Sequence, residues 1–220
     1  MICRPLGWVT MTERYLLLSV RAAREGARRI LAVESVSDAE KKRESFCLRA
    51  DFAVPARTPC EIDAAYYEEI RREHALCAAL DRGMRVLAAA GGSRVQVRQK
   101  LIARGVSRET AEDATQALEK QGYLQETQSA LSAARADLRK LWGDRRILSD
   151  LHAKGYGDEA LDAVKELLGE EDAAARCRKL MEKRHLLAQY EGDKLIAVLL
   201  RYGYTRTEIR AALREMTAEE

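Results

Sequence analysis

An internal repeat constrains this chain more than any other feature of its sequence. Three glycines, Gly105, Gly155 and Gly203, lie 50 and 48 residues apart, and aligning them brings apolar residues into register. The positions eight and four residues before each glycine are aliphatic, a spacing that puts both on one helical face. Apolar residues also recur six and thirteen positions after each glycine. Each glycine therefore separates two helices, where a left-handed residue commonly ends the first.

The expected helix starts support the same register. A glycine and then a polar residue precede the first short helix of each copy, and Ser and Asp are favoured N-caps. These pairs are Gly92-Ser93, Gly143-Asp144 and Gly192-Asp193. Ser93 with Gln96, and Thr205 with Glu208, predict capping boxes, in which side chain and backbone at a helix start bond reciprocally.

The repeat predicts a mostly α fold of about three tandem three-helix repeats. One copy can hardly bury its own apolar faces, whereas stacked copies can, so we expect an elongated, curved array. A small β-hairpin or three-stranded sheet should precede it. The expected organisation is an N-terminal extension without defined structure (1–29), a small hairpin region (30–60) and helical repeats at 61–124, 125–169 and 170–220.

The hairpin prediction rests on partial alternation of apolar and polar residues. Ile30–Val36 and Ser45–Arg49 are the two expected strands, and Phe52–Val54 is a short third candidate. A long helical pattern follows over Glu61–Ala90, with a break expected near Gly83. The first helices of the second and third repeats are expected at 125–142 and 170–190.

Residues 66–216 resemble the RecX family, regulators of the bacterial RecA recombinase. The segments that carry the resemblance are KLIARGVS, Gly122-Tyr123-Leu124, Gly143 followed by Arg146-Ile147, and Lys154-Gly155. The resemblance implies a protein that binds the groove of the RecA filament on single-stranded DNA. It implies inhibition of ATP hydrolysis, strand exchange and co-protease activity, and hence roles in DNA repair, recombination and the SOS response.

The charge pattern suggests where such a partner would bind. The net charge is only +3, so any basic surface must be local. The segment from Arg98 to Arg108 holds four basic residues and no acidic one. The candidate partner- or DNA-binding residues are Arg94, Arg98, Lys100, Arg104, Arg108, Arg139, Lys140, Arg145, Arg146, Lys154, Lys179, Lys183 and Lys194. The competing interpretation is an ordinary solvated helix exterior with acidic partners.

The sequence contains no recognisable catalytic or cofactor motif. Its three histidines lack an HExxH pattern, and the Gly91-Gly92-Ser93 turn lacks the lysine of a phosphate loop. We expect no enzyme activity, cofactor or metal. The five cysteines are scattered without CxxC spacing, which favours a reducing compartment. With no span of transmembrane length, a cytoplasmic monomer is expected.

Two functions from different classes fit these observations. The first is the RecA regulator that the resemblance implies, with Lys and Arg meeting DNA phosphates or acidic subunit faces. The second is a generic helical adaptor for a protein partner, without nucleic-acid contact. Salt separates them, because a phosphate-dominated contact weakens steeply with ionic strength and an apolar groove does not.

Overall fold

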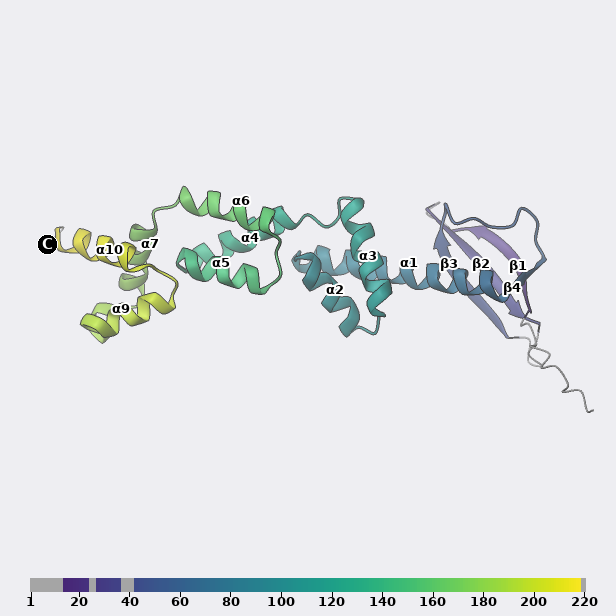
Figure 1. Ribbon diagram of the computed structural model, residues 1–220, viewed down its shortest axis with the longest axis horizontal. Helices are drawn as coiled ribbons and strands as arrows, with labels where there is room; N and C mark the ends of the chain where they lie inside the picture. The colour runs from purple at the N-terminus through teal and green to yellow at the C-terminus, as the bar shows by residue number, and fades with distance from the viewer. Residues whose placement is uncertain (1–13, 24–26, 37–41, 219–220) are drawn as a thin grey trace, which may run out of the picture. The chain divides into compact units, whose positions relative to one another are not determined.

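A computed structural model describes residues 14–23, 27–36 and 42–218 of the chain. It divides into two compact units (Figure 1). The first comprises the chain up to Arg82 together with Gly105–Ala114, and the second comprises Gly83–Arg104 and the chain from Thr115 onward. Each unit is described separately below.

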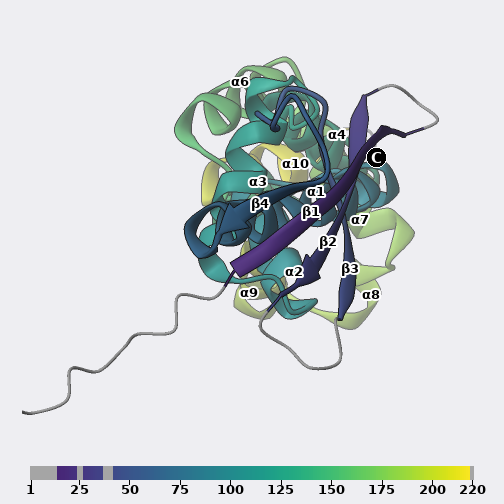
Figure 2. The same ribbon diagram turned by 90° about the vertical axis from the view of Figure 1, so that its right-hand side faces the viewer.

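The first unit is built on a four-stranded antiparallel sheet (Figure 2). Its strands are β1 (Arg14–Ala22), β2 (Arg28–Ser35), β3 (Arg43–Arg49) and β4 (Cys60–Asp63), in the spatial order β3-β2-β1-β4. Leu31 and Val33 of β2 and Phe46 and Leu48 of β3 are buried at alternate positions, which places one face of the sheet on the core.

The sheet corrects the expectation for the N-terminal part of the chain. The second and third strands match the predicted hairpin, but Phe52–Val54 is not a strand and the last strand is Cys60–Asp63. The central strand, β1, lies in the segment assigned to an unstructured extension. Only Leu17 is fully buried along β1, and most of its other residues are half-buried. A central strand covered partly on both faces does not show the alternation that identifies a half-buried strand.

Helix α1 (Ala64–Ala90) begins directly after β4, and its N-terminal part covers the buried face of the sheet. Ile70 packs among Leu17, Leu31 and Leu48. Ion pairs tie the same helix to β2 and β3: Arg28 bonds Asp81, and Arg49 Nε lies 2.5 Å from Glu73 Oε1. The His74 ring accepts the Cys47 backbone N–H at 3.0 Å. That contact covers part of the β3 edge, which would otherwise be open to another strand.

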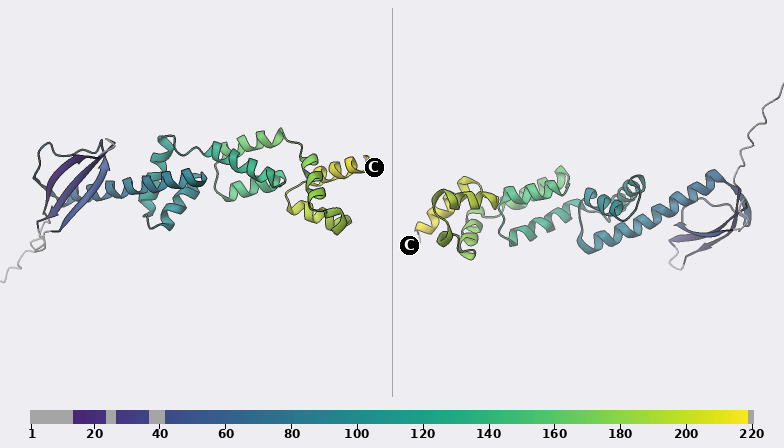
Figure 3. Two further views of the ribbon diagram at one scale, coloured as in Figure 1. Left: turned by 180° about the vertical axis from the view of Figure 1, so that it is seen from behind. Right: turned by 90° about the horizontal axis from the view of Figure 1, so that it is seen from below.

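The predicted break near Gly83 is absent, because α1 continues through it without interruption (Figure 3). A Cβ atom at Gly83 would lie 2.5 Å from Leu118 Cδ1. Glycine at this position lets Leu118 pack closely against the helix. Sequence periodicity does not distinguish a glycine needed for such packing from one that ends a helix.

The helical repeats follow the predicted order. The segment of the first repeat contains α1, α2 (Arg94–Ala103) and α3 (Arg108–Lys120), and that of the second contains α4 (Glu126–Arg139), α5 (Asp144–Ala153) and α6 (Asp158–Gly169). The third contains α7 (Ala173–Lys183), α8 (Leu186–Gln189), α9 (Gly192–Arg201) and α10 (Arg206–Ala218). The third repeat departs from one long first helix: His185, at φ 50°, separates α7 from the single turn α8.

The turn glycines occupy the predicted left-handed conformation, with φ of 83°, 75° and 96° at Gly105, Gly155 and Gly203. The capping box at Ser93 is present, and Thr205 and Glu208 make the reciprocal bonds of the second.

The other two predicted N-caps are each displaced by one or two residues. Gly143 rather than Asp144 caps α5, and Glu191 rather than Asp193 caps α9. Asp144 instead lies within the helix and pairs with Arg176, and the backbone of Gly143 is needed for contact with the next repeat. The N-caps of α2 and α5, Ser93 and Gly143, are therefore equivalent positions.

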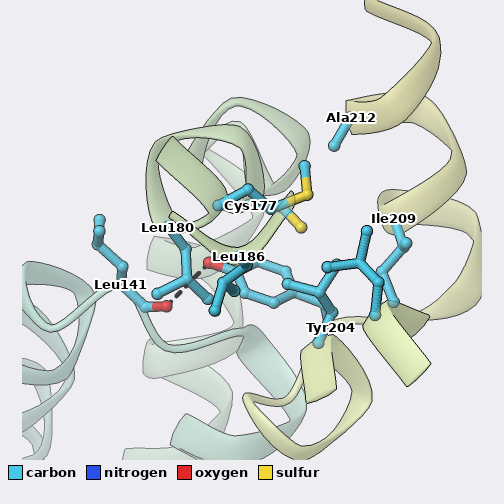
Figure 4. Close-up of a cluster of buried hydrophobic side chains, with 10 residues drawn as sticks. Leu141, Cys177, Leu180, Leu186, Tyr204, Ile209 and Ala212 are labelled. Carbon is cyan, nitrogen blue, oxygen red and sulfur yellow. Dashed lines mark hydrogen bonds between the residues drawn. The ribbon is translucent and has the colours of Figure 1, made fainter. Parts of the chain in front are cut away.

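The second and third repeats each bury their own hydrophobic cluster. In the second, Ala130, Ile147, Leu151 and Val164 are fully buried. The cluster of the third surrounds Tyr204, whose hydroxyl donates a 2.9 Å hydrogen bond to the Leu141 carbonyl (Figure 4). Leu141 belongs to the segment between α4 and α5, so this tyrosine links the third repeat to the second.

Two joints connect successive repeats by the same geometry. In the first joint, the start of α2 meets the turn between α5 and α6, and Ser93 Oγ donates to the Lys154 carbonyl at 2.6 Å. In the second joint, the start of α5 meets the turn between α9 and α10, and Gly143 N–H donates to the Tyr202 carbonyl at 2.8 Å. Equivalent residues thus meet in both joints, through a side chain in the first and through the backbone in the second.

Candidate partner and nucleic-acid interface

The basic residues of α2 do not share one face of the helix. Val97 and Leu101 form its buried stripe. At about 3.6 residues per turn, Arg98 lies on one side of that stripe, whereas Lys100 and the C-cap residue Arg104 lie on the other. Arg104 is exposed, and Arg98 and Lys100 are half-buried. The basic run therefore presents its charges in two directions.

Three of the candidate residues already have acidic partners. Arg94 Nη1 lies 3.2 Å from Glu119 Oε2, Lys140 Nζ lies 2.7 Å from Asp137 Oδ1, and Lys154 pairs with Asp150. The hydrogen bond from Lys154 to Asp150 raises the pKa of the Lys154 ammonium above its ordinary value. These ion pairs favour the interpretation of the three residues as part of an ordinary solvated helix exterior over the interpretation as a binding surface for a partner.

Other candidates are exposed side chains. Arg108 begins α3, Arg139 ends α4 and Arg145 lies in the first turn of α5. In the third repeat, Lys179 and Lys183 lie on α7 and Lys194 on α9. Six exposed candidates of the second unit have no carboxylate partner among the described residues: Arg104, Arg139, Arg145, Lys179, Lys183 and Lys194. They are the candidates most available to an anionic ligand.

Arg146 has an environment that the sequence did not reveal. Its guanidinium carbon lies 3.9 Å from the centroid of the Trp142 ring and 5.8 Å from that of Tyr202. Lys140 Nζ lies 4.8 Å from the same Trp142 ring. The four-residue spacing of Trp142 and Arg146 was a usable signal, but the approach of Tyr202 depends on the joint between repeats.

An ion pair between Arg176 and Asp144 lies next to Trp142. Arg176 is buried and bonds both Asp144 and the Trp142 carbonyl, the latter at 3.1 Å from its Nε. Burial raises the pKa of Asp144 above its ordinary value, although the positive charge of Arg176 opposes the shift. A buried charge without a partner costs far more than a paired one, so the pair holds its two elements in place.

Titratable side chains are not gathered into a catalytic or metal-binding arrangement in the described part of the chain. No group of three His, Cys, Asp or Glu side chains there is placed to hold a metal ion. His74 lies against β3, whereas His152 and His185 are exposed. The four described cysteines are free thiols.

A groove with no charged side chain in its lining lies beside the first joint. Its volume is about 590 Å³. It is lined by the end of α1, by neutral residues of α4 and by two tyrosines: Leu87, Ala88, Ala89, Ala90, Gly91, Gly92, Tyr123, Gln125, Gln128, Ser129, Ser132, Ala133, Ala136 and Tyr156. Tyr123 is 58% exposed. In a chain with 33% charged residues, this surface differs from its surroundings.

Among the described residues, no helix combines the length and apolar character needed to span a membrane.

Comparison with known proteins gives the fold and a family name. No family model matches the chain. The regulatory protein RecX of Pelodictyon phaeoclathratiforme is 29% identical over 142 residues, which cover 62% of this chain and 87% of the relative.

Two solved structures share the fold. A crystal structure of regulatory protein RecX superposes with a TM-score of 0.71 at 18% identity, covering 91% of this chain and 99% of the other. RecX from Lactobacillus salivarius gives 0.56 at 17% identity, covering 66% and 97%. The chain is therefore similar in sequence to a RecX regulatory protein and shares the fold of two RecX crystal structures.

Proposed function

We propose that this protein regulates the RecA recombinase by binding the groove of the RecA filament on single-stranded DNA. Similarity to the regulatory protein RecX, in sequence and in fold, is the observation that carries the proposal. Binding lowers ATP hydrolysis, strand exchange and co-protease activity without chemistry by the regulator itself. Its site of action is the cytoplasm, where the filament forms, and it acts as a monomer.

The exposed basic residues of the second unit supply the complementary charge. Arg104, Arg139 and Arg145 have no carboxylate partner among the described residues, so binding an anionic filament breaks no ion pair there. Charges of this kind accelerate association and orient the encounter more than they strengthen the final complex. The half-buried and paired candidates on α2 and α5 contribute less.

The direct test measures DNA-dependent ATP hydrolysis by RecA with and without this protein. We expect inhibition by the parent chain and a weaker effect from the triple variant Arg104→Gln, Arg139→Gln, Arg145→Gln. Its control removes three exposed charges elsewhere in the second unit: Lys165→Gln, Arg206→Gln, Arg210→Gln. Equal inhibition by both triple variants would count against these arginines, and no inhibition by the parent chain would count against the function.

The alternative function is a helical adaptor that binds a protein through the uncharged groove beside the first joint. The absence of charge from the groove lining favours this candidate. Salt dependence separates the two, because each phosphate contact on a single strand contributes about −0.7 to the slope of log affinity against log salt. Filament binding that is insensitive to salt would favour the groove.

A further inference from the structure

The Trp142, Arg146 and Tyr202 side chains form a cation and aromatic stack at the second joint. The Arg146 guanidinium lies 3.9 Å above Trp142 and 5.8 Å from Tyr202, measured to the ring centroids. All three side chains are half-buried, so part of each faces solvent. The stack therefore reaches the surface instead of being enclosed in a core.

Trp142 is fixed in position by its backbone. Its N–H donates to the Asp137 carbonyl at 3.3 Å, and its carbonyl accepts from Nε of the buried Arg176 at 3.1 Å. Arg176 is itself paired with Asp144. The ring itself packs against the hydrophobic cluster of the second repeat and against Arg146, so it is held before any ligand arrives, which reduces the ordering cost of binding.

Arg146 keeps its hydrogen-bond donors available. Among the residues that the structure describes, no carboxylate pairs with it, and its partners are the two rings. A guanidinium stacked on an aromatic ring uses its face and leaves its N–H edge for an anion. Lys140 and Arg145, which both precede Arg146 in the sequence, add positive charge.

Comparison with the first joint argues against a purely structural role for the stack. The positions equivalent to Trp142, Arg146 and Tyr202 are there Gly92, Gln96 and Lys154. The first joint nevertheless forms the corresponding hydrogen bond, from Ser93 to the Lys154 carbonyl. Repeats of this kind can join without an aromatic ring or a stacked cation, so the second joint carries an additional feature.

We propose that this stack is a binding site for one nucleotide of a single strand. A base stacks against the exposed aromatic and guanidinium surface, and its phosphate accepts hydrogen bonds from the Arg146 edge. Sequence-tolerant binding of single strands commonly uses aromatic and arginine planes together with backbone phosphates. The inference rests on the proposed function, since it specifies how this protein would contact the DNA of the filament.

The test uses Trp142 as its own reporter, without RecA. The chain has two tryptophans, so Trp8→Phe leaves Trp142 as the sole emitter. Titration with oligothymidylate should quench its fluorescence as a base stacks. Anisotropy of labelled oligothymidylate should show weakening of at least about tenfold for Trp142→Leu and for Arg146→Gln, as expected for one stacked base.

Arg210→Gln, which removes one exposed charge from α10, serves as the matched control and should weaken binding by less than about twofold. Arg146→Gln places at this position the residue that the first joint already carries, so it should preserve the fold, which circular dichroism checks.

Three results would overturn the inference. The first is oligothymidylate binding without quenching, and the second is equal affinity of Arg146→Gln and the control. The third combines two observations: oligothymidylate does not bind the parent chain, yet Arg146→Gln loses RecA inhibition. That combination would mean that the stack binds an acidic surface of a protein instead of a nucleotide. Failure of the proposed function is a separate observation, since it appears in RecA ATP hydrolysis alone.

Discussion

Replacing Gly143 with alanine tests the geometry of the second joint. Gly143 has φ −78° and ψ 158°, an extended conformation that alanine adopts without strain. The obstacle is space: a Cβ would lie 2.3 Å from the Gly203 carbonyl carbon and 2.5 Å from the Tyr204 nitrogen. Both obstructing atoms belong to backbone, so no rotamer change relieves the contact.

The cost follows from the displacement that this contact requires. To reach an ordinary separation near 3.4 Å, the turn must retreat by roughly 1 Å. The hydrogen bonds from Gly143 N–H to Tyr202 (2.8 Å) and from Arg145 N–H to Gly203 (3.3 Å) would then exceed bonding distance. Two such bonds contribute about 1–3 kcal/mol and overpacking costs a similar amount, so we expect a loss of about 2–6 kcal/mol.

Gly157→Ala is the matched control. Gly157 caps α6 with nearly the same backbone, φ −73° and ψ 166°, and its added Cβ would meet only Glu126 Oε2 at 3.5 Å. Changes in N-cap preference and unfolded-chain entropy are therefore shared by the two variants. Urea unfolding followed by circular dichroism and tryptophan emission gives the difference. Stabilities of the two variants within about 0.5 kcal/mol of each other would refute the close-contact argument.

Three further predictions concern stability and reactivity. Tyr67 donates a hydrogen bond to Glu44 that lowers the pKa of this carboxyl below its ordinary value of 4.5, so its stabilisation is present above that pH and lost as pH falls through the folded value. Tyr67→Phe should therefore cost about 1 kcal/mol at neutral pH and less near pH 3 by urea unfolding, and a constant difference would contradict this account. Leu151→Asp should reduce helicity by circular dichroism, since a fully buried carboxylate without a partner costs several kcal/mol; a parental melting temperature would disprove the register. Burial raises the thiol pKa of Cys77 to about 11 and of Cys177 to about 12, so both should resist a thiol reagent at pH 8 until the chain unfolds, and rapid labelling would show otherwise.

The helical repeat was predictable because its signals are local. The spacing of apolar residues around Gly105, Gly155 and Gly203 specifies helix, turn and helix, and all three glycines have the expected backbone. The strand β1 was missed because its pattern depends on cover from both faces of the sheet. Gly83 was misinterpreted because its role is a contact with another helix.

The candidate site was predictable only as a set of charges. Sequence identifies Arg146 as basic and places Trp142 four residues before it, but the approach of Tyr202 depends on the second joint, which brings together segments far apart in the chain. Lys140 and Lys154 differ in this respect, because their acidic partners Asp137 and Asp150 lie three and four residues earlier in the chain, a spacing that indicates such pairs from sequence. Charge can be counted from sequence, whereas its availability depends on tertiary neighbours.

The two joints should differ in stiffness. In the second, backbone rests directly on backbone between Gly143 and Gly203, so neither surface can yield by rotating a side chain. In the first, the turn at Gly155 rests on the Val95 side chain, and the linking hydrogen bond comes from the Ser93 hydroxyl. Side chains adjust at far lower cost than main chain. Bending within the second unit should therefore concentrate at the first joint, which would act as a hinge, whereas the second joint would stay rigid.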